Sequence, residues 1–463
     1  MSDWRRLPKG AGAAIAVAAG LVAGLLLAPV VAPWLTGRAS LSPVARQLRA
    51  QLGPADGEVG RFYRSDRYRL LWVDGRALKP EAAQLIARLR SSDRDGLDPA
   101  HYHLQQLNQE LGRAGSDPKA LALAELDLSR AYTTYVRDLH LAAPVARLAF
   151  IDPAVHTPPL GAYGVLEQAA KAPTMTDALQ GATKVNPIYS GLRDAWNARR
   201  AGHGDDQTAR LLRINMERAR ALPPDLGARY ILVNPAAETL WTYAGGQSQG
   251  QMRVVVGKLT EPTPSMIGLV RYALFNPYWN VPPDLVRDKI APKVLQHADY
   301  FTDQRFQALD GFRPNAAVLD PAKIDWKAVA SGAKTIRVRQ LPGPHNMMGT
   351  VKFMLPNRLG IYLHDTPMRG LFGDAARTDS AGCVRLQNPA RLAGWLFGRP
   401  VTPDTHGAPD QRVDLPTPVP VYILYLTAQP GSGRLSILPD IYNRDPAALA
   451  ALNASRAPVA TAR

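Results

Sequence analysis

The sequence predicts an α+β protein of several domains, in which a mostly helical N-terminal scaffold domain precedes a β-rich domain. Two observations predict this order. From Ser42 to about Pro153, apolar side chains recur at helical spacing behind prolines placed where helices start. After Gly227, the chain changes to short runs of β-branched and aromatic residues divided by Gly/Pro-rich turns. That texture predicts a β-sandwich or barrel-like domain.

Individual helices can be placed from their start signals. Pro80 opens one helix, and Asp117-Pro118 reads as the N-cap and first residue of a longer one. Asn186-Pro187 starts another, and an Arg-rich helix follows and ends before Pro223-Pro224. The stretch Leu160–Asp206 otherwise reads as short and polar.

The strands are expected where β-branched and aromatic residues gather. A hairpin turn is expected at Ala244-Gly245-Gly246, and a short helix at Pro389–Phe397. His364 falls at the end of one strand. The expected strands are Tyr230–Val233, Thr239–Tyr243, Met252–Val256, Arg271–Phe275, Thr335–Arg339, Lys352–Met354, Gly360–Leu363 and Val419–Leu426.

The N-terminus predicts export. A basic stretch, Trp4–Lys9, precedes a run from Gly10 to Gly37 without a charged residue, which is long enough to span a bilayer. The basic flank predicts that this end stays in the cytoplasm. A cleaved secretory signal is the other reading, because Gly37-Arg38-Ala39 has small residues at the positions a signal peptidase requires. We favour an uncleaved anchor, and either reading exports the remainder.

The net charge of the chain limits the kinds of binding partner that are expected. The chain has 463 residues and a formal net charge of +16. No block of five Lys/Arg, zinc-finger spacing or basic-aromatic stripe is present, so nucleic-acid binding is not expected. The charge fits an acidic extracellular polymer or membrane surface, or a general bias toward arginine.

Cys383 is the only cysteine, which excludes an internal disulfide and makes a structural metal site improbable. It is therefore either a buried structural thiol or a nucleophile, with His364 nineteen residues upstream as a candidate base. Gly382 favours the nucleophile, because glycine lets the backbone turn tightly and direct amides at a reacting carbonyl. No cofactor and no metal are expected.

These motifs resemble those of a known family. His364-Asp365-Thr366 followed by Ser-x-Gly-Cys-Val-Arg at 380–385 is similar to the active-site signature of the L,D-transpeptidases with a YkuD-type catalytic domain. The runs Phe275–Pro283, Leu341–Pro344, Leu71–Gly75 and Asp95–Asp98 resemble the large periplasmic, Gram-negative branch. The resemblance extends from about Val44 to Asp445.

The resemblance implies a domain plan with two departures from the family. Residues 1–40 would form the cytoplasmic tail with the anchor or signal, 41–225 the helical scaffold, 226–449 the catalytic sandwich and 450–463 a disordered tail. A lid over the cleft is expected at about 278–343. Ala381 stands where many members have a second histidine, and no match to a peptidoglycan-binding helical module is visible in Leu160–Asp206.

The resemblance also implies roles for single residues. Cys383 would be the nucleophile, His364 the general base and acid, held by the backbone carbonyl of Asp365, and Gly382 an oxyanion donor through its amide. Arg385 would grip a substrate carboxylate, or alternatively form a structural salt bridge with Asp374 or Asp379. The residues expected to contact substrate are Arg385, Tyr362, Ser380, Trp279 and Tyr278. The three aromatic residues among them could equally belong to the core of a strand-rich domain.

The function that follows is 3→3 crosslinking of peptidoglycan stem peptides through a Cys thioester, in the periplasm, with carbapenem-type inhibitors as ligands. Two alternatives stay open. The same acyl-enzyme could pass its acyl group to water or another amine, as in a peptidase or a lipoprotein-attaching enzyme. The chain could also be a non-catalytic wall-binding scaffold, which the intact Cys383 and His364 disfavour.

Overall fold

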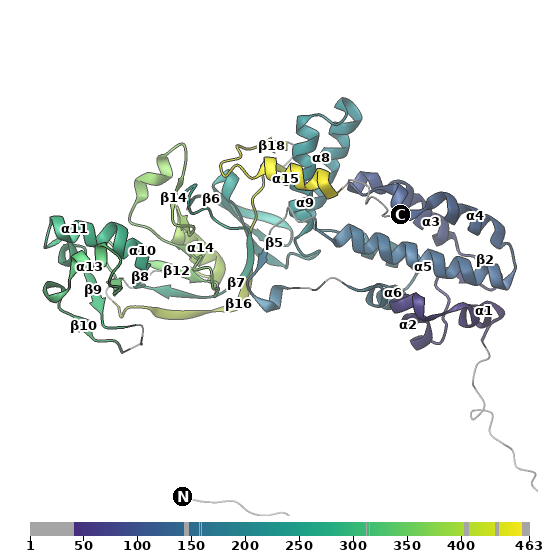
Figure 1. Cartoon of the computed structure of the whole chain (residues 1–463), viewed down its shortest axis with the longest axis horizontal. Helices are drawn as coiled ribbons and strands as arrows, with labels where there is room; N and C mark the ends of the chain where they lie inside the picture. The colour runs from purple at the N-terminus through teal and green to yellow at the C-terminus, as the bar shows by residue number, and fades with distance from the viewer. Residues whose placement is uncertain are drawn as a thin grey trace, which may run out of the picture. The chain divides into compact units, whose positions relative to one another are not determined.

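A computed structural model describes residues 41–142, 148–156, 158, 160–311, 313, 315–401, 407–430 and 435–455. The expected anchor or signal at residues 1–40 lies outside these ranges, as do residues 456–463. Among the described residues, no helix combines the length and the apolar character needed to cross a bilayer. The predicted α+β class, with helices first and a β-rich domain after them, is confirmed (Figure 1).

Proline and aspartate set the starts of the first helices, as predicted. Pro80 opens α3, and Asp117 caps α5 by accepting a hydrogen bond from the Ala120 amide. The predicted stripe of α5, including Leu121 and Tyr132, is buried. The helices are α1 (Pro43–Gln51), α2 (Gly57–Ser65), α3 (Pro80–Arg90), α4 (Leu104–Ala114) and α5 (Pro118–His140), with a small hairpin of β1 (Val73–Asp74) and β2 (Ala77–Leu78) between α2 and α3.

The segment expected to be short and polar contains two further helices before Asn186. These are α6 (Ala162–Lys171) and α7 (Met175–Ala182), which bury Leu166 and Leu179 completely. Each helix buries only three residues, the others being Val165, Ala169, Met175 and Ala178, so the apolar signal in the sequence is weak. Helix α8 (Pro187–His203) starts where predicted, with Asn186 accepting a hydrogen bond from the Tyr189 amide.

Helix α9 (Gln207–Arg220) is the predicted Arg-rich helix, and three of its four arginines, Arg213, Arg218 and Arg220, are buried. Arg220 donates to the carbonyls of Leu139 and Asp95 in the helical part. Arg218 pairs with Asp445 at 2.7 Å, near the C-terminal end of the described chain. One helix is therefore bonded to segments far apart in the sequence.

The largest hydrophobic cluster is continuous between helices and strands. It combines residues of α1 to α9, such as Leu48 and Trp196, with residues of the strands that follow, such as Leu232, Tyr422 and Leu424. A second cluster lies within the β-rich part.

The main sheet closes on itself. Its order is β12-β13-β15-β6-β5-β4-β16-β7-β3, and β12 also pairs with β7, so the strands from β12 to β7 form a barrel-like ring. Gly245 and Gly246 both have positive φ at the predicted hairpin turn between β5 and β6, as a two-residue type I′ turn requires. The strands are β3 (Ala149–Phe150), β4 (Arg229–Asn234), β5 (Thr239–Ala244), β6 (Gln247–Gly257), β7 (Met266–Phe275), β12 (Val351–Met354), β13 (Leu363–His364), β14 (Thr378–Ser380), β15 (Val384–Leu386) and β16 (Gln411–Ile423).

Two elements adjoin strand β15, which follows Cys383: helix α14 (Pro389–Phe397) comes after it in the chain, and β13 pairs with it. Helix α14 has the predicted bounds and buries Leu392 and Leu396 against the sheet. Strand β13 is shorter than predicted, because Gly360 takes a positive φ and Asn357 bonds the backbone of Ile361 instead of a neighbouring strand.

Residues 279–340 form a small subdomain with its own sheet and core. The sheet order is β10-β9-β11-β8, and the core includes Phe301, Phe306 and Trp326. This subdomain occupies most of the segment expected to be a lid. Its elements are β8 (Trp279–Val281), α10 (Pro283–Leu285), the π-helical turn η8 (Val286–Ile290), α11 (Ala291–Gln296), α12 (Tyr300–Asp303), β9 (Phe306–Leu309), β10 (Val318–Leu319), α13 (Trp326–Ala330) and β11 (Arg337–Gln340).

The C-terminal region corrects one expectation. The boundary expected at residue 450 falls inside α15 (Asp445–Ser455), which is a helix rather than a disordered tail as far as Ser455. Leu452 is buried against Ile214 of α9, which explains why the helix continues. A small hairpin of β17 (Ala428–Pro430) and β18 (Leu435–Ile437) precedes α15.

Candidate active site

Three adjacent strands place the candidate residues on one face of the sheet. Lys352 of β12 is paired with His364 of β13, and His364 with Arg385 of β15. Side chains alternate between the faces of a strand, so Cys383 lies on the same face as Arg385. The intervening residues Phe353, Leu363 and Val384 point the other way and are completely buried.

The turn before Cys383 requires glycine. Gly382 has φ +94°, and a Cβ there would lie 3.0 Å from the side chain of Ile361. Thr263 Oγ1 donates to the Gly382 carbonyl at 2.9 Å. Because the C=O and N–H of a trans peptide point in opposite directions, this bond turns the Cys383 amide away from Thr263.

Ser380 shapes the same turn. Its hydroxyl donates to the Cys383 carbonyl at 2.5 Å, and its side chain is buried. The structure therefore gives Ser380 a backbone partner, whereas the sequence suggested a contact with substrate.

His364 is buried and held by its neighbour. Its Nδ1 lies 2.5 Å from the backbone carbonyl of Asp365, so Nδ1 carries the proton and donates it. The remaining ring nitrogen, Nε2, is then a proton acceptor.

The carboxylate of Asp365 fixes the loop that supplies this carbonyl. It accepts hydrogen bonds from the Thr350 amide and hydroxyl, both at 2.8 Å, and from the Thr366 amide at 2.7 Å. Arg369 pairs with the same carboxylate. These partners hold the carbonyl, and through it the ring of His364.

In the resting site, the imidazole of His364 and the thiol of Cys383 are both neutral. Burial lowers the pKa of His364 to about 3, opposed by the bond to Asp365 and assisted by Arg385 and Lys352. Burial also raises the pKa of the Cys383 thiol, while a backbone hydrogen bond from Tyr362 and the charges of Lys352 and Arg385 lower it. The thiol donates to the Gly360 carbonyl at 3.3 Å. The structure therefore differs from the expected thiolate held by His364, because burial disfavours both charges.

Tyr362 and Arg385 lie beside the thiol. Burial raises the pKa of Tyr362, and the charge of an ionised Cys383 raises it further. The Arg385 side chain is 12% exposed, and its nearest carboxylate is Asp379, at 3.9 Å and largely exposed. Such a long contact with an exposed carboxylate stabilises little, which leaves the guanidinium suited to an anion in the cleft.

For Trp279, the structure supports the core alternative. The Trp279 ring packs 6.3 Å from that of Phe306, in the core of the inserted subdomain, because β8 pairs with β11 rather than with the closed sheet. The Tyr278 ring lies under the Arg339 guanidinium at 4.3 Å. The described contacts do not bring either ring to Cys383.

Lys352 and Thr263 were missed by the sequence analysis. Lys352 lay inside a predicted strand, but its place beside the cysteine depends on pairing between distant strands. Thr263 reaches Gly382 across a separation of 119 residues. The alternation Val351-Lys352-Phe353 was the one available signal, since a lysine between buried residues marks the exposed face.

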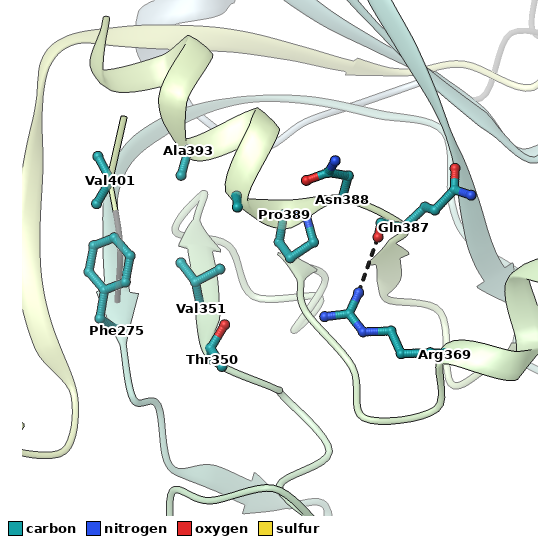
Figure 2. Close-up of a pocket in the computed structure, with 10 residues that line it drawn as sticks. Phe275, Thr350, Val351, Arg369, Gln387, Asn388, Pro389, Ala393 and Val401 are labelled. Atoms are coloured by element: carbon teal, nitrogen blue, oxygen red, sulfur yellow. Dashed lines mark hydrogen bonds between the residues drawn. The ribbon is translucent and has the colours of Figure 1, made fainter. Parts of the chain in front are cut away.

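A cavity of about 370 Å³ lies near this site but does not contain it (Figure 2). Its lining includes Phe275, Val351 and Pro389, and Arg369 donates to the Gln387 carbonyl at 3.1 Å on its wall. Neither Cys383 nor His364 lines it. The candidate residues therefore lie on the strand face and not in this cavity.

Fold and site together define a domain with a closed β-sheet that carries a thiol and a histidine on one face. Residues 228–421 match the family model of the YkuD L,D-transpeptidase catalytic domain, and residues 57–195 match the model described as a scaffold domain. The β-rich part of this chain is therefore similar to the catalytic domain of the L,D-transpeptidases.

A curated Haemophilus influenzae protein, named provisionally as an L,D-transpeptidase, is 34% identical over 245 residues. The match covers 50% of this chain and 48% of that protein, so the chain spans about half the length of this relative.

Solved structures are more distant. An L,D-transpeptidase from Mycobacterium smegmatis has 12% identity and a TM-score of 0.22, covering 42% of this chain and 58% of its own. An Enterococcus faecium L,D-transpeptidase has 15% identity and a TM-score of 0.21, covering 44% and 52%.

Proposed function

We propose that this chain is a peptidoglycan L,D-transpeptidase that forms 3→3 crosslinks through a thioester on Cys383. The observation that carries the proposal is the shared strand face, where a thiol on a Gly-Cys turn lies among His364, Tyr362 and Arg385 in a domain of this family. The basic balance of the chain fits stem peptides, which carry carboxylates.

The first half-reaction forms the acyl-enzyme. The Cys383 sulfur attacks the carbonyl carbon of the third residue of a donor stem tetrapeptide, and the thiol proton passes to Nε2 of His364. The bond to the terminal D-Ala breaks, and the proton on His364 passes to the departing amine. A neutral thiol and a neutral imidazole suffice, because the proton moves as the C–S bond forms.

The second half-reaction reverses these roles. The side-chain amine of a diamino acid in a second stem attacks the thioester carbonyl, and His364 takes the amine proton. The C–S bond breaks and the sulfur regains its proton, so the net change is one amide bond exchanged for another. The amides of Gly382 and Cys383 are the proposed oxyanion donors; losing one such donor typically costs about 3–4 kcal/mol.

The proposed substrate grip is Arg385, which forms a bidentate pair with a stem carboxylate. The proposed location is the periplasm, with the N-terminal segment as anchor or signal. Carbapenems are the proposed class of inhibitor, because their strained carbonyl imitates the carbonyl of the donor peptide. Transfer of the same acyl group to water or to a lipoprotein amine is the second candidate, since the choice of acceptor depends on pocket shape.

The test is mass analysis of wall fragments from cells that carry the wild-type gene, Cys383→Ala or no gene. We expect 3→3 dimers only with the wild type. Crosslinks at wild-type level with a folded Cys383→Ala protein would refute the mechanism, and trimmed tripeptides or lipoprotein adducts without dimers would select the second candidate.

The role of Arg385 has its own comparison. Arg385→Ala should weaken turnover by roughly 30-fold or more, since a desolvated charge pair is worth about 2–5 kcal/mol. Arg61→Ala, which removes an exposed arginine of α2, is the matched control. Equal activity of the two variants would remove Arg385 from substrate binding.

A further inference from the structure

Lys352 is a half-buried cation that the reaction described above does not use. Its ammonium lies 3.6 Å from the centre of the Tyr362 ring. Within the described parts of the chain, no carboxylate lies within 4.0 Å of it, so its charge has no contacting counter-ion there. An ammonium over an aromatic face is held by the ring's quadrupole, and more strongly when water is excluded.

Strand pairing makes the location of Lys352 specific. Its partner in β13 is His364, and the ring that holds it belongs to Tyr362, two residues earlier on the same face. The Val384 amide donates to the Tyr362 carbonyl at 2.9 Å, which fixes this strand against the one that carries the cysteine. The lysine is thereby held on the face where the sulfur lies.

The other groups around the thiol do not provide a positive charge equivalent to that of Lys352. His364 is neutral at physiological pH because burial lowers its pKa. Arg385, on β15, is assigned to a substrate carboxylate in the proposed function, and its charge lowers the pKa of the Cys383 thiol less than that of Lys352 does. Tyr272 of β7 faces Tyr362, and Asp410 acts on Lys352 from the segment before β16.

We propose that Lys352 is a positioning cation for the thiol: seated on the Tyr362 ring, its ammonium stabilises the Cys383 thiolate as it forms. The proposal deepens the proposed function, on which its catalytic meaning rests. Its electrostatic content is independent of any substrate.

The supporting effects are reciprocal. The Lys352 charge lowers the pKa of the Cys383 thiol, and more strongly than that of Arg385 does. An ionised Cys383 in turn raises the pKa of Lys352, which burial otherwise lowers. Mutual effects of opposite sign are what a cation and a nearby nascent anion produce.

The experiment is the pH profile of iodoacetamide alkylation of the full chain, read by intact-protein mass. Cys383 is the only thiol, so one adduct reports it. We expect Lys352→Met to raise the midpoint of the profile by about one pH unit, which makes alkylation about tenfold slower below the midpoint. Lys352→Arg should return most of the shift, because it keeps the charge.

Lys323→Met is the matched control, since this lysine is 84% exposed and lies in the inserted subdomain. Its profile should superimpose on that of the wild type. Thermal unfolding of each variant checks folding, and Lys352→Gln serves as a second neutral variant if Lys352→Met does not fold.

A profile of folded Lys352→Met that coincides with the wild-type profile would overturn the proposal. So would a Lys352→Arg profile shifted as far as that of Lys352→Met, because charge would then be irrelevant. The assay contains no peptidoglycan. If the expected shifts occur in a chain that makes no crosslinks, the electrostatic role stands and the proposed function fails.

Discussion

Acid should destabilise this protein through His364 more than through an ordinary histidine. Burial lowers its pKa from 6.5 to about 3 in the folded chain. The unfolded chain therefore binds a proton that the folded chain refuses, in the window between these two values. A lowered folded pKa means that the stability is present above pH 6.5 and is lost as the pH falls toward 3.

The size of the effect follows from that difference. Each pKa unit corresponds to about 1.4 kcal/mol, so the full window is worth up to about 5 kcal/mol. Between pH 7 and pH 4 the loss should be about 3 kcal/mol. His364→Gln cannot take up the proton and should lack this component.

The assay is urea unfolding of the wild type and His364→Gln at pH 7, 5 and 4. Other groups titrate in both proteins and cancel in the comparison. We expect the wild type to lose about 3 kcal/mol more than the variant between pH 7 and pH 4. Parallel losses in the two proteins would refute a neutral, desolvated His364, and His364→Asn gives an independent repeat.

Two further predictions concern groups that hold the fold around and away from the site. Gly349→Ala should lower the free energy of unfolding by about 2–4 kcal/mol, because Gly349 has φ +60° and its new Cβ would overlap the Asp365 carboxylate. Urea unfolding measures this change, and a loss below about 1 kcal/mol would contradict the predicted overlap. Glu125→Leu should lower the free energy of unfolding by about 3–5 kcal/mol, because the buried carboxylate accepts hydrogen bonds from Tyr63 and from the amides of Leu71 and Trp72. Glu125→Gln keeps one acceptor oxygen and should lower it less. An equal loss in both variants would show that the lost acceptors are not the cause.

Local chemistry explains what could be predicted from the sequence. Proline at Pro80 and Pro118 and the double glycine of the β5–β6 turn determine their own conformation, so helix starts and the hairpin were correctly placed. The motif also pointed to His364 and Cys383, and the structure places them on neighbouring strands. Both kinds of signal lie within a few residues of the feature that they predict.

The sequence is less informative where contacts between distant segments determine the surroundings of a residue. Lys352 becomes a neighbour of the thiol only when β12, β13 and β15 align. For Trp279 two readings were open, cleft wall or core, and only the pairing of β8 with β11 places its ring in the core of the inserted subdomain. Leu452 is buried only because α9 lies against α15, so a helix was missed in a segment of alanine-rich composition.

The hydrophobic cluster shared by helices and strands has a consequence for how the protein can be divided. The family match begins at residue 228, but Leu232 and Tyr422 pack with residues of α1 to α9. A fragment cut at that boundary would expose these side chains and would also lose the α9 partners of Thr427 and Asp445.

The boundary of the family match therefore does not coincide with the boundary of a part of the chain that could unfold on its own. Helices and strands should melt in one transition, since neither part can open without uncovering apolar surface of the other. Changes in the N-terminal helices then affect the surroundings of Cys383 through stability, without any contact with this residue.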